Sequence, residues 1–149
     1  MTAPPLDPTG ADRRLRVVYC AVPTLDLAQK LAEEVVRRRL AGCANFWPIR
    51  STYLWRGKLE NAEEVAMLFK TSQKKLGALF RYVAAHHPYE VPDLFEVQVP
   101  RVHEPFIAWL LASIDPRSAE PVPLKRSGSR PAPAARARPR TRAPRHRRY

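Results

Sequence analysis

The sequence predicts one α+β domain with a four-stranded antiparallel sheet and an additional C-terminal helix. Short apolar segments alternate with segments of helical periodicity, in the order strand, helix, strand, strand, helix, strand, helix. This pattern is confined to residues 15–115, the usual size of one domain. Residues 1–14 and 116–149 are rich in proline and poor in large apolar residues. We therefore expect a flexible N-terminal lead-in and a disordered C-terminal tail.

The first two elements are predicted to be a buried strand and an amphipathic helix. Residues 16–22 are apolar and rich in valine, and Pro23 closes the run. Thr24 is suited to the N-cap of the helix, and we expect Gly42 to end it. The helical spacing of the apolar residues predicts one buried face. These residues are Leu27, Ala28, Leu31, Ala32, Val35 and Val36.

Residues 43–55 and 58–70 predict two long antiparallel strands joined by a turn at Arg56–Gly57. Pro48 marks a bulge or an edge in the first strand. Apolar side chains occupy both faces of this strand, whereas helices on one side of a sheet leave the other face in water. We therefore expect oligomerisation to cover the second face. Trp47, Ile49, Tyr53 and Trp55 share one parity, and Phe46 and Leu54 share the other.

The remaining pattern completes the fold. Apolar spacing predicts a second helix after Ser72, which must end at His86 or His87 because Pro88 follows. Residues 94–99 alternate as a half-buried strand, and residues 106–114 predict a short last helix. This order is the ferredoxin-like βαββαβ arrangement, with two helices on one face of the sheet.

The charge is concentrated in the tail. Of the formal net charge of +12, residues 116–149 carry +10, because they hold ten Arg and one Lys against Glu120 alone. The rest of the chain is nearly neutral. We interpret the tail as a solvated extension, and the alternative is salt-sensitive binding to nucleic acid or to an acidic partner.

The location predicted from the sequence is the cytoplasm. The N-terminus lacks the apolar core of a secretory signal, and no apolar run approaches the length that crosses a membrane. Cys20 and Cys43 are too few for a disulfide framework and are expected to remain thiols.

The candidate site is the stretch His86-His87-Pro88-Tyr89-Glu90-Val91-Pro92-Asp93. Together with Cys20, the residues His86, His87 and Asp93 have the donor chemistry of a copper or zinc site. The fold order suggests that Cys20 and His86 lie at opposite ends of the sheet, so that they would need a partner subunit, or a position of Cys20 further back along the first strand, to meet. Considered from spacing alone, helix termination by the two histidines and core packing of Cys20 are favoured over metal binding.

Catalytic motifs are lacking in the sequence, which has no phosphate-binding glycine loop, nucleophile elbow or paired-carboxylate pattern. An enzyme is therefore not expected. Polar residues of the hairpin either line a pocket or form a solvated strand face with cross-strand charge pairs. They are Lys58, Glu60, Glu63, Glu64 and Lys70.

Four segments, in this order, resemble the CutA family, the divalent-cation tolerance proteins. They are Ala41–Asn45, Tyr53–Glu60, Phe69–Thr71 and His86–Pro92. The resemblance covers residues 16–115 and implies a ferredoxin-like homotrimer with contacts along the long hairpin. It also implies that copper or another divalent cation is associated with four residues of this chain. These are Cys20, His86, His87 and Asp93. At the position of the fourth, Asp93, the family usually has Glu.

The sequence thus supports a cytoplasmic, homotrimeric, copper-binding tolerance protein without turnover as the leading hypothesis. The rival is a signalling module like the trimeric PII proteins, which bind small anionic ligands in clefts between subunits. Lys58, Lys70, Tyr89 and Glu64 would serve such a cleft.

Overall fold

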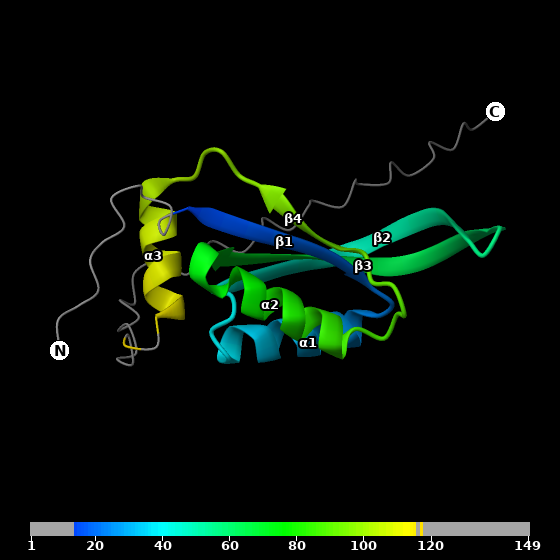
Figure 1. Cartoon of the computed structure of the whole chain (residues 1–149), viewed down its shortest axis with the longest axis horizontal. Coiled ribbons are helices and arrows are strands. Elements are labelled where there is room, and N and C mark those ends of the chain that lie inside the picture. Colours follow the sequence, from blue (N-terminus) through cyan, green and yellow to red (C-terminus); the bar gives the residue numbers. More distant parts are fainter. Residues whose placement is uncertain (1–13, 116, 118–149) are drawn as a thin grey trace, which may run out of the picture. The chain divides into compact units, whose positions relative to one another are not determined.

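A computed structural model of the chain describes residues 14–115 and residue 117. The predicted order of strands and helices is confirmed (Figure 1). The predicted lead-in (residues 1–14) and basic tail (residues 116–149) lie outside the described residues, apart from Arg14 and Arg117. The elements are β1 (Leu15–Val22), α1 (Leu25–Arg37), β2 (Cys43–Trp55), β3 (Lys58–Ser72), α2 (Gln73–His86), β4 (Leu94–Gln98) and α3 (Glu104–Ile114).

The four strands form one antiparallel sheet in the order β2-β3-β1-β4. Arg56 and Gly57 make the tight turn between β2 and β3, and both have positive φ values, 49° and 78°. This is the backbone that two-residue hairpin turns favour. Pro48 lies on the edge strand, where proline is best tolerated in a sheet, and its pairing with Val65 continues the register without a bulge. Figure 1 shows the hairpin extending past the two long helices.

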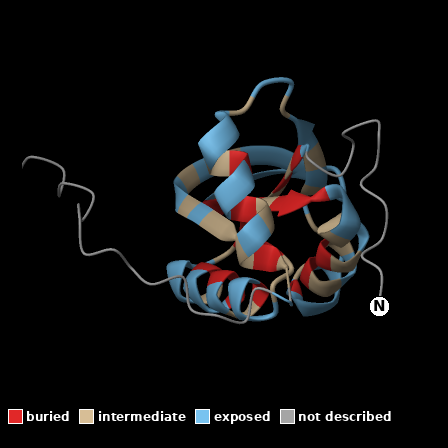
Figure 2. Ribbon diagram, turned by 90° about the vertical axis from the view of Figure 1, so that its left-hand side faces the viewer, coloured by how far each residue is buried: buried red, intermediate tan, exposed pale blue. Residues whose placement is uncertain are grey.

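Helices α1 and α2 cover one face of the sheet, and the main core lies between them and the strands (Figure 2). Val18, Cys20 and Val22 project from β1 into this core. Their alternate spacing places them on one face of the strand. Helix α3 packs against the other face and covers Leu15 and Val17.

The first helix begins as predicted but does not end as predicted. The hydroxyl of Thr24 accepts a hydrogen bond from the Leu27 N–H at 3.2 Å, which confirms the N-cap. The helix ends at Arg37, and Arg39, with φ of 55°, takes the left-handed conformation expected of Gly42. Gly42 has a different role, because a Cβ there would lie 2.5 Å from Ser113 Oγ and 2.6 Å from Leu110 Cδ1. It permits close approach of α3.

Much of the face opposite α1 and α2 remains exposed and apolar. Trp47, Tyr53 and Trp55 lie there on β2, and Phe95 and Val97 extend the same face on β4. Each is more than one third exposed. Only α3 covers part of this face among the described elements, so the predicted surplus of apolar strand surface is real.

No helix in the described part of the chain is long and apolar enough to span a bilayer.

Candidate functional site

The loop after α2 lies at the C-terminal end of β1. Because β1 and β3 are antiparallel, β3 ends where β1 begins, at the pairing of Leu15 with Ser72. Helix α2 starts there and returns along the sheet, so that His87 reaches the Ala21 carbonyl at 2.7 Å. Cys20, paired with Leu94, lies at this same end. The prediction that Cys20 and His86 lie at opposite ends is therefore wrong, since it treated β1 and β3 as ending at the same edge.

Both ring nitrogens of His87 are occupied by backbone groups. The Tyr89 N–H donates to Nδ1 at 3.1 Å, and Nε2 donates to the Ala21 carbonyl at 2.7 Å. An N–H can only donate and a carbonyl can only accept, so the ring is neutral and its proton is on Nε2. The side chain is 9% exposed. His87 has no lone pair left for a metal ion in this conformation.

His86 differs from His87 in its exposure to solvent and in the hydrogen bonds of its ring nitrogens. It is exposed, and its Nδ1 donates to the Tyr82 carbonyl at 2.8 Å. Its ring stacks on that of Tyr82 with 4.0 Å between centroids. The hydrogen bond at Nδ1 leaves the Nε2 lone pair outward, and imidazoles that bind metal ions are commonly oriented in this way.

Cys20 is fully buried in the core between the sheet and the helices. Burial, with a smaller contribution from the charge of Asp93, raises the pKa of its thiol to about 12. Metal ions bind the thiolate. In this chain the protonated thiol has no solvent contact and packs in the core as a small apolar side chain does.

Asp93 is exposed at the start of β4, and its carboxylate lines a cleft beside the hairpin. The structure therefore separates the four predicted ligands into one exposed imidazole, one exposed carboxylate, one engaged imidazole and one buried thiol. Among the described residues, no three His, Cys, Asp or Glu side chains are grouped so as to hold a metal ion. The predicted ligand set does not form a complete site within one chain.

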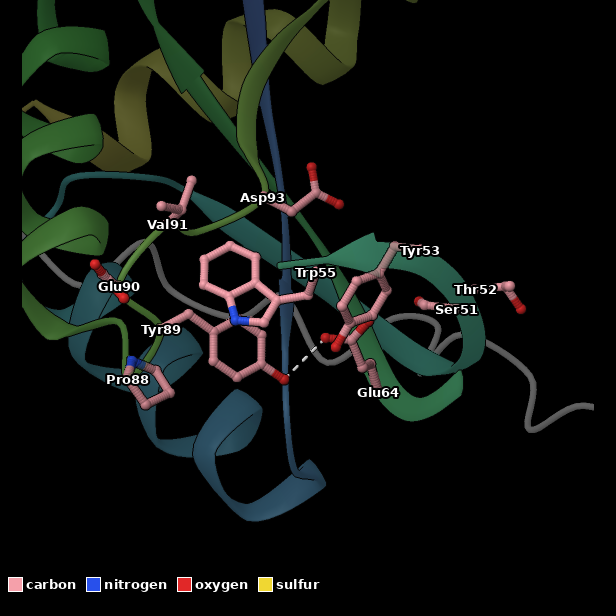
Figure 3. A pocket seen from close by; sticks show the side chains of 10 residues that line it. All are labelled: Ser51, Thr52, Tyr53, Trp55, Glu64, Pro88, Tyr89, Glu90, Val91 and Asp93. Carbon is pink, nitrogen blue, oxygen red and sulfur yellow. Dashed lines mark hydrogen bonds between the residues drawn. The ribbon is translucent and has the colours of Figure 1, made fainter. Parts of the chain in front are cut away.

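The cleft lies between the β2–β3 hairpin and the 88–93 loop and has a volume of about 690 Å³ (Figure 3). Volumes of this size are typical of small-molecule sites. Aromatic rings and carboxylates dominate its wall. The lining residues are Ser51, Thr52, Tyr53, Trp55, Glu64, Pro88, Tyr89, Glu90, Val91 and Asp93.

Glu64 and Tyr89 join the two sides of the cleft. The Tyr89 hydroxyl donates to Glu64 Oε1 at 2.9 Å, drawn as the dashed line in Figure 3. Glu64 is only 7% exposed. Burial and this hydrogen bond to Glu64 raise the pKa of Tyr89 to about 12, so the phenol remains protonated and remains the donor. Tyr53, also on the wall, raises it slightly further.

Arg56 contacts two of the residues that line the cleft, Trp55 and Glu90. From the hairpin turn, its guanidinium lies 5.5 Å from the centre of the Trp55 ring and donates to Glu90 Oε2 at 3.2 Å. It thus links the hairpin to the 88–93 loop through a cation–π contact and an exposed ion pair.

The cleft does not have the charge that an anionic ligand requires. Lys58 and Lys70, which the PII-like alternative assigned to such a cleft, do not line it in the described structure, whereas Glu64, Glu90 and Asp93 do. Lys70 lies elsewhere, with Nζ 3.8 Å from Cys43 Sγ. The acidic wall therefore disfavours the anionic-ligand alternative.

The PII-like alternative assigned Glu64 and Tyr89 to a cleft between subunits, whereas they line a cleft within one chain. Trp55 and Tyr53, which also line it, were expected to be core residues or subunit contacts. The pairing of β2 with β3 could have predicted their place in the cleft, because it fixes which side chains share a face of the sheet. Glu64 pairs with Ile49, which places its carboxylate on the same face as Tyr53 and Trp55.

Comparison with known proteins points to one family. A family model described as CutA1 divalent ion tolerance protein matches residues 16–113, from β1 to α3. The chain is also similar to the divalent-cation tolerance protein CutA of Yersinia pestis. The two are 39% identical over 99 residues, which make up 66% of this chain and 83% of that protein.

Solved structures with the same fold carry the same description. The periplasmic divalent cation tolerance protein CutA from Archaeoglobus fulgidus is 31% identical, with a TM-score of 0.66 over 68% of this chain and 99% of that chain. CutA1 from Oryza sativa is 32% identical, with a TM-score of 0.65 over 69% of this chain and 95% of that chain. The similarity covers both sides of the cleft and the loop that holds the two histidines.

Proposed function

Because the chain belongs to the CutA1 divalent ion tolerance family, we propose that it binds copper or a similar divalent cation as a cytoplasmic homotrimer. The observation that carries this proposal is the match of the family model from residue 16 to residue 113. Relatives described as divalent-cation tolerance proteins support the same role. Zinc also suits imidazole and carboxylate donors.

His86 is the imidazole ligand in this proposal. Its exposed ring is oriented by the hydrogen bond at Nδ1, which leaves Nε2 for the ion. His87 acts indirectly, because its hydrogen bonds to the Ala21 carbonyl and the Tyr89 N–H hold the loop in place. Cys20 is not assigned as a ligand in this proposal, because its side chain is buried in the core between the sheet and the helices.

The remaining ligands are carboxylates and groups from a second copy of the chain. Asp93 is exposed in the same loop region as His86 and offers a hard oxygen donor. No group of three ligands occurs within the described part of one chain. Ligands from another subunit would complete the coordination, which couples metal binding to assembly.

The exposed apolar face of the sheet supports the homotrimer. Trp47, Phe95 and Val97 lie on the face that α1 and α2 leave open. Exposed apolar surface of this extent is usually covered by a partner. A second and third copy of the chain are the partners that the proposal assigns to it.

Binding without turnover fits the composition of the cleft. Its lining includes carboxylates, hydroxyls and aromatic rings, but neither an imidazole nor a thiol from the described residues. Ser–His and Cys–His nucleophile–base pairs need one of those groups. The proposal is therefore that the protein binds its ion and releases it unchanged.

Copper titration of single histidine variants tests the metal site. His86→Ala is expected to raise the Kd for Cu²⁺ by about tenfold or more, because it removes a direct ligand. His103→Ala is the matched control, since this histidine lies at the start of α3, in a different loop. Equal affinities of the wild type and His86→Ala would refute the assignment.

Sedimentation of the full chain tests the assembly. Trp47→Asp is expected to shift the trimer to smaller species, because a buried unpaired charge is costly at an interface. Leu25→Asp is the control, since Leu25 is exposed on α1 rather than on the apolar sheet face. A wild-type chain that sediments as a monomer at all concentrations contradicts the homotrimer.

Cell fractionation tests the location. The Archaeoglobus fulgidus relative is described as periplasmic, whereas the proposal places this chain in the cytoplasm. Recovery of the native protein with a cytoplasmic marker enzyme is the expected result. Recovery in another compartment contradicts it.

A further inference from the structure

The carboxylate of Glu64 lacks a positive partner within the described part of the chain. Its one polar contact there is the hydroxyl of Tyr89, at 2.9 Å. Glu64 is nevertheless 93% buried on the residue scale, being 7% exposed. A buried carboxylate is costly unless a positive charge or several donors compensate it. Because Glu64 also lines the cleft, a ligand entering there can supply the missing charge.

The walls around Glu64 are aromatic. Tyr53 and Trp55 approach from β2, and Tyr89 approaches from the loop, as Figure 3 shows. The face of each ring carries partial negative charge that attracts cations. Carboxylates at the mouth, Glu90 and Asp93, add to the negative potential. This combination of aromatic rings and carboxylates is the chemistry that recognises organic cations.

Arg56 shows that the cleft wall holds such a group. Its guanidinium occupies the position over Trp55, 5.5 Å from the ring centre, and bonds to Glu90 at 3.2 Å. Both partners are exposed, so this contact is weakly held and can be exchanged. Arg56 pairs with Glu90 and not with Glu64, which leaves the Glu64 carboxylate for a ligand.

We propose that the cleft between the β2–β3 hairpin and the 88–93 loop binds a small organic cation, an amine or a guanidine, through Glu64 and the rings of Tyr53, Trp55 and Tyr89. The volume of about 690 Å³ is far larger than one metal ion needs and fits a small organic molecule. A ligand with two cationic groups reaches Glu64 with one end and Glu90 with the other, displacing Arg56.

This site is distinct from the metal ligand His86, which does not line the cleft. Asp93 belongs to both sites, so the two functions are separated by variants of His86 and of Glu64 rather than of Asp93. Loss of His86 affects the metal ion, and loss of Glu64 affects the organic cation.

Calorimetric titration of the full chain with agmatine, which has an amine at one end and a guanidine at the other, tests the proposal. We expect saturable binding that weakens as salt is raised. An uncharged molecule of similar shape, N-butylurea, is expected to bind at least about tenfold more weakly, because it cannot pair with Glu64. Equal binding of the two compounds overturns the proposal, as does the absence of agmatine binding.

Variants of the wall identify the contacts. Glu64→Gln retains an acceptor for Tyr89 but removes the charge, and we expect about a tenfold loss of agmatine affinity or more. Glu90→Gln and Trp55→Leu, at exposed positions, are expected to weaken binding several-fold and keep the test valid if Glu64→Gln does not fold. Arg56→Ala is expected to strengthen binding, because it removes the competing guanidinium.

Copper titration of the same proteins separates the two sites. His86→Ala is expected to leave agmatine affinity unchanged, and Glu64→Gln is expected to leave copper affinity unchanged. Agmatine affinity that falls with His86→Ala but not with any cleft variant would overturn the assignment to this cleft.

Discussion

The ring of His87 lies with Nε2 2.7 Å from the carbonyl oxygen of Ala21, 66 residues earlier in the chain. The same ring accepts the N–H of Tyr89 at Nδ1. One side chain therefore fastens the end of β1 to the loop that forms one side of the cleft. Its neighbour His86, which is exposed, makes no comparable long-range contact within the described structure.

Replacement of His87 should therefore reduce stability more than replacement of His86. His87→Ala removes two hydrogen bonds and leaves the Ala21 carbonyl without its partner, at an expected cost of about 1–3 kcal/mol. His86→Ala, at an exposed position, should change the free energy of unfolding by less than about 1 kcal/mol. Urea unfolding of both variants measures the difference. Equal losses of unfolding free energy in the two variants would show that His87 contributes no more to stability than His86.

The hydrogen bond from Tyr89 to Glu64 should make stability fall at alkaline pH. The pKa of Tyr89 rises from 10.0 to about 12 on folding, mainly through burial and then through Glu64. A raised pKa favours the folded state below pH 10, and this contribution is lost as the pH rises from 10 to about 12. Thermal unfolding across this range should show a steeper decline for the wild type than for Tyr89→Phe. Parallel curves for the two proteins would contradict the shift.

Cys20 should resist alkylation in the folded protein. Its burial raises the pKa of the thiol to about 12, and the thiolate is the form that reacts. Cys43 is only half-buried and should react first. Mass spectrometry after iodoacetamide treatment at mildly alkaline pH should find Cys43 modified and Cys20 intact, until denaturant exposes it. Rapid labelling of Cys20 in the Cys43→Ser variant would show that the core is open.

Gly42 should tolerate no side chain without movement of α3. A Cβ at this position meets Ser113 Oγ and the buried Leu110 Cδ1 well inside contact distance. Gly42→Ala is expected to cost about 1–3 kcal/mol of unfolding free energy through overpacking. Gly77→Ala is the matched control, because it lies within α2, its nearest contact is the Arg81 side chain at 3.4 Å, and alanine favours helix by about 1 kcal/mol. Stabilisation by both substitutions would contradict the role assigned to Gly42.

The order of the elements was predictable because it depends on local signals. The strand at residues 16–22, the Thr24 cap and the turn at Arg56–Gly57 each follow from neighbouring residues, and all three are confirmed. The end of α1 was not, because Arg39 adopts the left-handed conformation that glycine usually takes. Arg39 also contacts residues far along the chain. Its Nη1 donates to the carbonyl of Ser113 at 3.4 Å and to that of Asp115 at 2.6 Å.

The site was predictable only in part. The stretch from His86 to Asp93 does lie beside a cleft, and Glu64 with Tyr89 does join its two sides. The metal role of Cys20 could not be judged from sequence, because thiol protonation depends on how deeply the core buries it. The placement of the loop beside β1 followed from the antiparallel pairing of β1 with β3, which the sequence-based reasoning misread.

The sequence by itself determined the order of strands and helices, the resemblance to one family and the stretch in which to look for the site. These features rest on periodicity and short motifs, which local interactions encode. Only the tertiary structure decided which histidine is free. His86 is the last residue of α2, whereas His87 has left the helix with an extended backbone and its ring bonds to the Ala21 carbonyl at the end of β1. Strand parity places Glu64 on the same face as Tyr53 and Trp55, but its burial and its hydrogen bond to Tyr89 depend on the packing of distant segments.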